Sequence, residues 1–268
     1  MIHKAKKSLG QNFLKSLPAL AMMCSAGEIN NKDLILEIGP GKGALTSKLL
    51  LEAGKVLAIE KDKDLFEFLK EKFVKEIKNK KLELVRGDIL EFNPTTYYLL
   101  PATYKVIANI PYNITGSIFK KFLSNETQPQ TMVLLVQKEV AERIVARDNK
   151  ESILSLSVKA YGNPKYMMKV HKRFFSPAPK VDSAIISINN ISRNNFKTKN
   201  EENNFFNVIK TGFAHKRKVL RKNLEILQKK SNQIDNIFEK LNINPKSRAE
   251  DIKLEIWLEI SRCLSTEI

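Results

Sequence analysis

The sequence has few cysteines, and none of its histidines or cysteines is spaced as in a metal site. Its 268 residues include two cysteines, Cys24 and Cys263, at opposite ends of the chain. So few cysteines are typical of reduced thiols in an intracellular protein and argue against a disulfide framework. His3, His171 and His215 also lack metal-ligand spacing. We therefore expect no metal and assign none of these histidines a catalytic role.

Long hydrophobic runs are missing as well. No stretch of about 18 apolar residues is present, which argues against a membrane-spanning helix. The opening residues, MIHKAKKSLGQNFL, lack the apolar segment of a signal peptide. No lipidation signal appears, and no amphipathic helix has a broad apolar face opposite a basic one. We expect a soluble, cytoplasmic protein.

Acidic residues are scarce relative to basic ones. The chain has 46 Lys and Arg against 29 Asp and Glu, a net charge of +17. Such an excess raises self-repulsion and is typical of proteins that bind polyanions, most often nucleic acid. Basic residues are densest in KTGFAHKRKVLRKNLEILQKK (210–230), and Lys4, Lys6 and Lys7 extend the set. A solvated helix face would look similar. The net charge favours binding to nucleic-acid phosphates, for which the candidates are Lys216, Arg217, Lys218, Arg221 and Lys222, with Lys229 and Lys230 beyond them.

The first two-thirds of the chain alternates short apolar runs with segments of helical periodicity. Between the runs, residues 63–78 repeat Leu65, Leu69, Phe73 and Ile77 along one side of a helix. Nearly continuous hydrophobicity is typical of strands buried on both faces of a parallel sheet. We predict a doubly wound α/β sheet, with ligands at the carboxyl ends of its strands. The predicted strands are LILEI (34–38), VLAI (56–59), LELV (82–85), VIAN (106–109) and MVLLVQ (132–137).

The composition changes after SAIISI (183–188). The next stretch, NNISRNNFKTKNEENN, is polar and without periodicity, and from Phe205 onward only helical patterns appear. We predict a catalytic domain over 1–188, a linker over 189–204 and a small all-helical, RNA-binding domain over 205–268.

A glycine loop lies between the first predicted strand and its helix, with an acidic residue before it. Gly39, Gly41 and Gly43 permit positive φ and close approach of a ligand, although a plain structural turn would look similar. Glu60 ends the second strand, where a carboxylate can accept both ribose hydroxyls, and Asp88 follows the third strand within reach of an adenine amino group. The loop follows Glu37 with Gly-x-Gly-x-Gly spacing, not the Gly-x-Gly-x-x-Gly of dehydrogenases. This spacing favours S-adenosylmethionine.

The fourth strand ends in Asn109-Ile110-Pro111-Tyr112, an amide, a fixed-φ turn and an aromatic ring. An exocyclic amino group on a base is a poor nucleophile because its lone pair is delocalised into the ring. The Asn109 side chain and the Ile110 carbonyl can accept its two hydrogens and turn the lone pair towards a methyl donor. Pro111 fixes the turn and supplies no competing donor, while Tyr112 offers a stacking face. A turn capped by a core tyrosine is the alternative, and we predict an amino-methylating site.

Six blocks resemble the ribosomal RNA adenine dimethyltransferase family, in its order and across nearly the whole chain. The resemblance implies a Rossmann-like class I methyltransferase sheet with a helical C-terminal domain. It also implies S-adenosylmethionine as cofactor and two adjacent dimethylated adenines near the 3′ end of small-subunit (16S) RNA. The partner implied is an immature small subunit, whose maturation the enzyme would assist, and we expect a monomer. The blocks are GQNFL (10–14), EIGPGKGALT (37–46), NIPYNIT (109–115), LVQKEVAERI (135–144), FSPAPKVDSAI (175–185) and NPKSRAEDI (244–252).

The resemblance also implies roles for single residues. Asn109 to Tyr112 carry the transfer without a general base, and Phe175 sandwiches the target adenine against Tyr112. Glu37 lies near the methionine end of the cofactor, and Asn12 and Leu14 close over it. The remaining cofactor contacts are Gly39, Gly41, Glu60, Asp88 and Asn109. The chain departs from the family at Leu9, usually Phe, and at Ile153-Leu154, usually Tyr-Gly.

Three alternatives remain. Large-subunit resistance methyltransferases share the catalytic blocks, although PKSRAED near the C-terminus resembles the small-subunit branch. A ribosome-assembly factor or nucleic-acid-binding module without turnover is also compatible with the charge. A dehydrogenase is disfavoured by the spacing of the glycine loop and by the basic charge.

Overall fold

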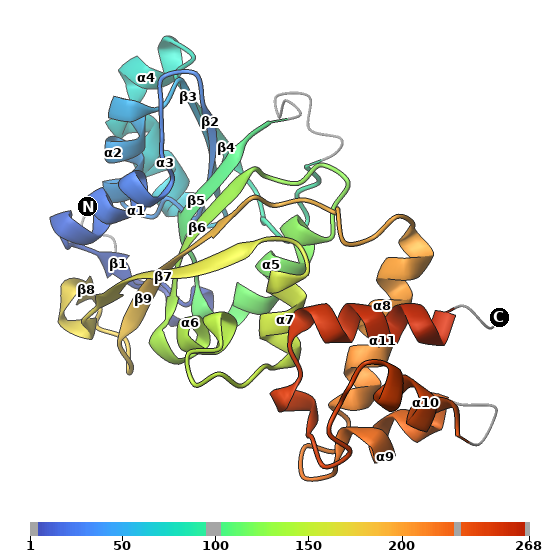
Figure 1. Ribbon diagram of the computed structural model, residues 1–268. Coiled ribbons are helices and arrows are strands. Elements are labelled where there is room, and N and C mark those ends of the chain that lie inside the picture. Colours follow the sequence, from blue (N-terminus) through green and yellow to red (C-terminus); the bar gives the residue numbers. More distant parts are fainter. Residues whose placement is uncertain (1–4, 95–102, 228–231, 266–268) are drawn as a thin grey trace. The chain divides into compact units, whose positions relative to one another are not determined.

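The computed structural model describes residues 5–94, 103–227 and 232–265, which form two compact units (Figure 1). Unit 1 combines 1–141 with 163–191, and unit 2 combines 142–162 with 192–268. No helix within the described ranges is long and apolar enough to cross a bilayer. In the same ranges, no group of three or more His, Cys, Asp or Glu side chains is placed to hold a metal ion.

Within its described residues, unit 1 is built on a seven-stranded sheet of order β4-β3-β2-β5-β6-β9-β7. The first five strands in this order, β4, β3, β2, β5 and β6, are parallel to one another. β9 is antiparallel to both β6 and β7. The parallel strands confirm the five strands predicted from the apolar runs. They are β2 (Leu34–Ile38), β3 (Lys55–Glu60), β4 (Leu82–Arg86), β5 (Lys105–Asn109) and β6 (Thr131–Gln137).

The parallel strands are apolar because helices cover the sheet on both faces. Residues 132–136 of β6 are fully buried, and each large apolar side chain buried in this way stabilises the fold by about 1.5–3 kcal/mol. Helices α1, α2 and α3 share one core cluster with the sheet, and α5 lies on the opposite face (Figure 1). The helices of unit 1 are α1 (Leu17–Ala26), α2 (Ala44–Glu52), α3 (Lys63–Lys72), α4 (Val74–Lys78) and α5 (Thr115–Leu123).

The helix predicted over 63–78 is divided in two. Phe73, with φ −114°, separates α3 from α4. Its ring is buried against the glycine loop, because a Cβ added at Gly43 would lie 2.6 Å from it. The predicted apolar side is correct, since Leu65, Leu69 and Phe73 are all buried.

Two antiparallel additions complete unit 1. β7 (Asn163–Val170) forms one edge of the sheet beside β9 (Ser183–Asn189), and β1 (Phe13–Leu14) pairs with β8 (Phe175–Ser176). We did not predict β7, because its lysines and half-exposed residues lack an apolar run. The β1–β8 pairing joins the GQNFL block to the FSPAPKVDSAI block.

Unit 2 is helical in its described residues. α8 packs along α11, where the fully buried Trp257 stacks on Phe213 at 5.7 Å between ring centroids. The indole leaves no room for a side chain at Gly212, since an added Cβ would lie 2.3 Å from it. α6 (Lys138–Val145) begins in the segment assigned to unit 1 and ends in the segment assigned to unit 2. The other helices are α7 (Ile153–Lys159), α8 (Lys199–Gly212), α9 (Leu220–Leu224), α10 (Gln233–Lys240) and α11 (Leu254–Ser265).

The structure divides the chain differently from the predicted domains. α8 begins at Lys199, inside the predicted linker 189–204, and residues 142–162 join the helical unit. Phe196 is buried among Tyr161, Phe205 and Phe206, while Arg193 and Tyr161 both bind the buried Glu202. The prediction differed because the asparagine-rich composition conceals a buried aromatic cluster around an acid.

Candidate active site

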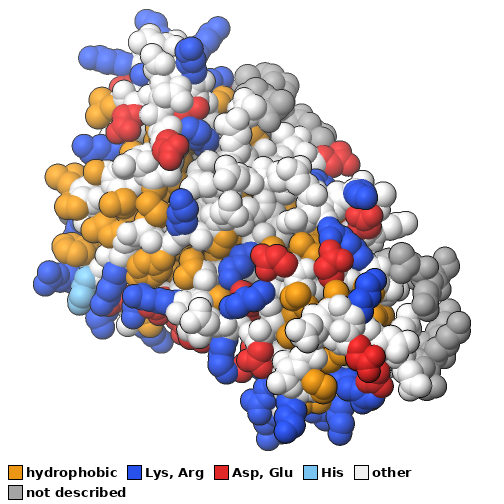
Figure 2. Space-filling model, in the orientation of Figure 1, with side chains coloured by type: hydrophobic (Ala, Val, Ile, Leu, Met, Phe, Trp, Pro, Cys, Tyr) orange, Lys and Arg blue, Asp and Glu red, His pale blue; other side chains and the backbone are white. Residues whose placement is uncertain are grey.

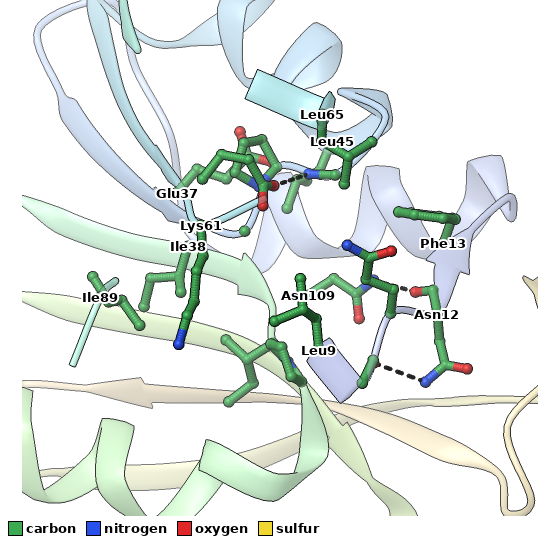
Figure 3. A pocket seen from close by; sticks show the side chains of 18 of the residues that line it. Leu9, Asn12, Phe13, Glu37, Ile38, Leu45, Lys61, Leu65, Ile89 and Asn109 are labelled. Atoms are coloured by element: carbon green, nitrogen blue, oxygen red, sulfur yellow. Dashed lines mark hydrogen bonds between the residues drawn. The ribbon is translucent and has the colours of Figure 1, made fainter. Parts of the chain in front are cut away.

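A cavity of about 540 Å³ opens at the carboxyl ends of β2, β3, β4 and β5 (Figure 3). The direction of strand order changes between β2 and β5, which is where ligands bind in sheets of this class. The volume of the cavity is typical of a small-molecule site. Most of the predicted site residues line it: Asn12, Leu14, Glu37, Gly39, Gly41, Glu60, Asp88, Asn109, Ile110, Pro111 and Tyr112.

The glycine loop forms one wall of the cavity. Gly39 has φ +63°, and a Cβ added there would meet no atom within 4 Å. Gly41 has φ +59°, and a Cβ there would lie 3.0 Å from the Phe13 ring. A side chain at Gly39 would therefore occupy ligand space, and one at Gly41 would displace the N-terminal segment.

Glu60 is held in one orientation by two backbone amides. Its Oε2 accepts from the Gly41 N–H at 3.0 Å, and its Oε1 accepts from the Asp62 N–H at 2.8 Å. Burial raises the pKa of this carboxyl despite those bonds. Each oxygen retains a lone pair for a hydroxyl donor, as a ribose requires.

Glu37 is buried without enough partners. It is 1% exposed, and its Oε2 accepts no hydrogen bond from the described residues. Burial raises its pKa to about 8. A buried carboxyl in this condition is costly unless a ligand supplies a donor or a positive charge.

Asp88 stands between a lysine and a backbone amide. Its Oδ2 accepts from Lys61 Nζ at 2.6 Å, and its Oδ1 accepts from the Leu90 N–H at 2.9 Å. Partial burial favours a raised pKa, but the Lys61 and Leu90 contacts and the nearby charges of Lys61 and Lys121 together outweigh it and hold the Asp88 pKa below its ordinary value. Asp88 is therefore an ionised acceptor at the cavity wall. We did not predict Lys61, which also lines the cavity.

The N-terminal segment orients Asn109. The Asn109 Nδ2 donates to the main-chain oxygen of Asn12 at 3.1 Å, and Figure 3 shows the two residues side by side. A carbonyl oxygen cannot donate, so the amide must turn its nitrogen to Asn12, which leaves Oδ1 as a free acceptor. Gly10 allows this approach, because a Cβ there would lie 3.3 Å from Pro111.

A second contact of this segment was not predicted. Lys6 Nζ lies 2.7 Å from Asp62 Oδ1, and Gln11 Nε2 donates to Asp62 Oδ2 at 2.7 Å. Burial favours a raised pKa for Asp62, but these contacts prevail and lower it. The sequence signal was limited to the N-cap of α3, where Asp62 accepts from the Asp64 N–H.

The structure does not bring Phe175 to the cavity. This residue is 4% exposed and pairs with Leu14 through β8 and β1, inside the core cluster of unit 1. Ser176 lines the cavity instead, because neighbouring side chains of a strand face opposite sides. Phe174 is exposed, with the Arg173 guanidinium 5.2 Å from its ring centroid.

The predicted RNA-binding residues lie in unit 2. Lys216, Arg217 and Lys218 are exposed in a turn between α8 and α9, so they do not form the continuous helix face considered above. Lys222 is exposed on α9, whereas Arg221 is paired with Asp235 and Glu225. Figure 2 shows basic side chains gathered around this part of unit 2. Lys4, Lys229 and Lys230 lie outside the described residues.

Known proteins are similar to this chain over nearly its whole length. Residues 2–266 match the family described as Ribosomal RNA adenine dimethylase. A Ribosomal RNA small subunit methyltransferase A from Fusobacterium nucleatum subsp. nucleatum is 39% identical over 262 residues, covering 97% of each chain. A protein of the same description from a Nostoc species is 36% identical over 275 residues, covering 98% of this chain and 99% of its own.

Two solved structures share the fold. The dimethyladenosine transferase from Plasmodium falciparum has a TM-score of 0.78 and 26% identity, covering 92% of this chain and 95% of its own. The 23S rRNA methyltransferase ErmE also has a TM-score of 0.78, with 24% identity, covering 95% of this chain and all of its own. At that identity, the second likeness bears on the fold alone.

Proposed function

The chain belongs to the ribosomal RNA adenine dimethylase family, and from that premise we propose that it dimethylates two adjacent adenines near the 3′ end of small-subunit RNA. Adenine dimethylation of small-subunit ribosomal RNA is the activity of this chain, because relatives at 36–39% identity over nearly the full length are small-subunit methyltransferases. The proposed substrate is an immature small ribosomal subunit. The proposed cellular role is to assist the maturation of this subunit.

S-adenosylmethionine is the proposed methyl donor, and it supplies a methyl group on a cationic sulfur. The residues present fit it. Glu37 has an unpartnered buried oxygen for the ammonium at the methionine end, and Glu60 has free lone pairs for the ribose hydroxyls. Asp88 is an ionised acceptor for the adenine amino group. An added Cβ at Gly39 or Gly87 meets nothing within 4 Å, so both glycines leave room for the ligand.

Asn109 is the residue that activates the target nitrogen. The observation that carries the proposal is the bond from its Nδ2 to the Asn12 carbonyl, because this bond fixes Oδ1 as an acceptor at the cavity. Oδ1 and the Ile110 carbonyl would accept the two hydrogens of the adenine amino group, which would turn the nitrogen lone pair towards the methyl donor. The proton is lost after the nitrogen becomes positive, so no general base is required.

Tyr112 and the basic residues hold the RNA. Tyr112 lines the cavity beside Asn109, and a base splayed from its stem can stack on its ring. Stacking of this kind contributes about 1–3 kcal/mol, comparable to the cost of unstacking the base. Exposed Lys216, Arg217 and Lys218 bind phosphates and supply affinity without reading sequence.

Mass spectrometry of ribosomal RNA tests the proposal. Unmethylated small and large ribosomal subunits are incubated separately with the protein and S-adenosylmethionine, and the digested RNA is analysed for dimethyladenosine. We expect two adjacent dimethyladenosines near the 3′ end of the small-subunit RNA and none in the large subunit. Methylation confined to the large subunit would indicate the resistance type. Subunit binding without methylation would indicate an assembly factor.

A further inference from the structure

We propose that Ser183 is a positioning residue for methyl transfer, which acts by holding the Tyr112 ring in the orientation that stacks the target adenine. The inference rests on the proposed function and adds a residue with no role so far. The Ser183 Oγ and the Tyr112 hydroxyl oxygen lie 2.6 Å apart and share a hydrogen bond. Among the described residues, neither hydroxyl has another hydrogen-bond partner. Ser183 is fully buried, so water does not compete for its hydroxyl.

Ser183 lies on an interior strand of the sheet. It begins β9, which lies between two strands, and it pairs with Gln137 of β6 on one side and Val170 of β7 on the other. The preceding residue is also fixed, because the Asp182 carbonyl accepts from the Lys138 N–H at 3.0 Å. The Asp182 carboxylate accepts from the Lys172 N–H, also at 3.0 Å. The backbone of Ser183 is therefore fixed by contacts on both sides, and a single side-chain torsion places its hydroxyl.

Tyr112 has no comparable support for its ring. It begins the short 3-10 turn η2 (Tyr112–Ile114), and its carbonyl accepts from Thr115 Oγ1 at 3.0 Å. That bond holds the backbone and leaves the side-chain torsions free. The ring is only half-buried, so packing does not immobilise it fully. The hydroxyl at the far end of the ring is the point where a single bond removes most of the remaining rotation.

This arrangement explains why a tyrosine suits the position. A phenylalanine offers the same stacking face, and the hydroxyl makes no required contact with the adenine in the proposed mechanism. Instead, the Tyr112 hydroxyl forms the hydrogen bond to β9 that orients the ring. If the Tyr112 ring is already oriented before the base binds, reaching the reactive geometry costs less entropy. Loss of this orientation should therefore lower mainly kcat.

The first experiment compares two serines of β9. Ser183→Ala removes the hydroxyl that contacts Tyr112. Ser187→Ala is the matched control, since Ser187 is 1% exposed, lies on the same face of β9 and donates to Met167 Sδ at 3.4 Å. We expect Ser183→Ala to lower kcat on small-subunit RNA about five- to tenfold, the usual size for one hydrogen bond. Affinity for S-adenosylmethionine by calorimetry should stay unchanged, and Ser187→Ala should change kcat less than twofold, roughly the scatter of a neutral substitution.

The second experiment is a double-mutant cycle with Tyr112→Phe. This variant keeps the ring and loses the bond, so it should reproduce the Ser183→Ala loss, and the double variant should lose no more than either single one. Independent, multiplying losses would overturn the inference, as would equal losses in Ser183→Ala and Ser187→Ala. Should Ser183→Ala fail to fold, Tyr112→Phe tests the same bond with β9 unchanged, and an unaltered kcat there would refute it. A wild-type protein that methylates no small-subunit RNA would instead refute the proposed function.

Discussion

Glu37→Gln tests the unpartnered carboxyl through the pH dependence of stability. In the folded protein without ligand, burial raises the pKa of Glu37 from its ordinary value of 4.5 to about 8. Between these values the unfolded chain has lost the proton and the folded protein has kept it, so wild-type stability falls as pH rises. The contribution is fully present below pH 4.5 and is lost on passing pH 8. Each pH unit in this window is worth about 1.4 kcal/mol.

The measurement is chemical denaturation of wild type and Glu37→Gln at matched pH values without ligand. Glutamine has the same shape and does not titrate, so the difference between the two proteins isolates this group from all others. From pH 6 to pH 8, wild type should lose about 2 kcal/mol relative to the variant, because half of the folded protein has already lost the proton at pH 8, and above this range the difference should level off. Parallel stability curves for the two proteins would refute the reasoning.

The protonation state of Glu37 should also affect the affinity for S-adenosylmethionine. An ammonium group beside Glu37 favours the ionised form, so S-adenosylmethionine should bind wild type about tenfold more tightly at pH 7 than at pH 6. The binding should release a proton, which calorimetry in buffers of different ionisation enthalpy detects. Glu37→Gln should show neither effect. Equal pH dependence in both proteins would place the ammonium elsewhere.

The remaining predictions concern transfer and RNA. Asn109→Ala should lower the rate of methyl transfer about 10²–10³-fold, the usual loss for one preorganised polar partner, in single-turnover assays. Tyr112→Ala should weaken RNA turnover far more than S-adenosylmethionine binding, measured by kinetics and calorimetry. Replacing Lys216, Arg217 and Lys218 by alanine should weaken RNA binding and reduce the slope of log affinity against log salt by roughly 0.7–0.9 per residue.

Each of these variants has a clear contrary outcome. An Asn109→Ala protein of normal speed would remove this amide from the mechanism, and equal losses of cofactor and RNA in Tyr112→Ala would argue against stacking. For the basic turn, the control is a variant with the same loss of charge on unit 1. The salt slope of this control should match that of wild type. An equal decrease of the slope in both variants would mean that the turn contributes only through the net charge of the protein and does not contact phosphates. The control replaces three exposed lysines, Lys75, Lys78 and Lys80.

Local signals in the sequence were enough for the parallel sheet and for much of the cavity. The apolar runs are continuous because both faces of these strands are covered, so their short, unbroken hydrophobicity identified them. Glu60 and Asn109 end parallel strands and Asp88 follows one, and the carboxyl ends of such strands meet at one edge. Their gathering in one cavity therefore followed from their places in the chain.

Other features had no local signature. β7 has alternating exposure and lysines, and Phe196 lies in an asparagine-rich stretch that resembles a linker. The turn at 216–218 interrupts a segment that seemed helical, and Phe175 faces the core because β1 pairs with β8. For β7, Phe196 and Phe175 the outcome depends on a partner far away in sequence.

The order of glycines, acids and apolar runs by itself determined the parallel strands, and it predicted the edge at which a ligand is expected and the chemistry proposed for the strand end at Asn109. Only the tertiary structure decided that Asn12 turns the Asn109 amide, that Asp62 holds the N-terminal segment, and that Ser183 anchors Tyr112. The reason is physical. Strand position follows from local sequence, whereas a hydrogen bond between residues 50 to 100 positions apart exists only after the chain has packed.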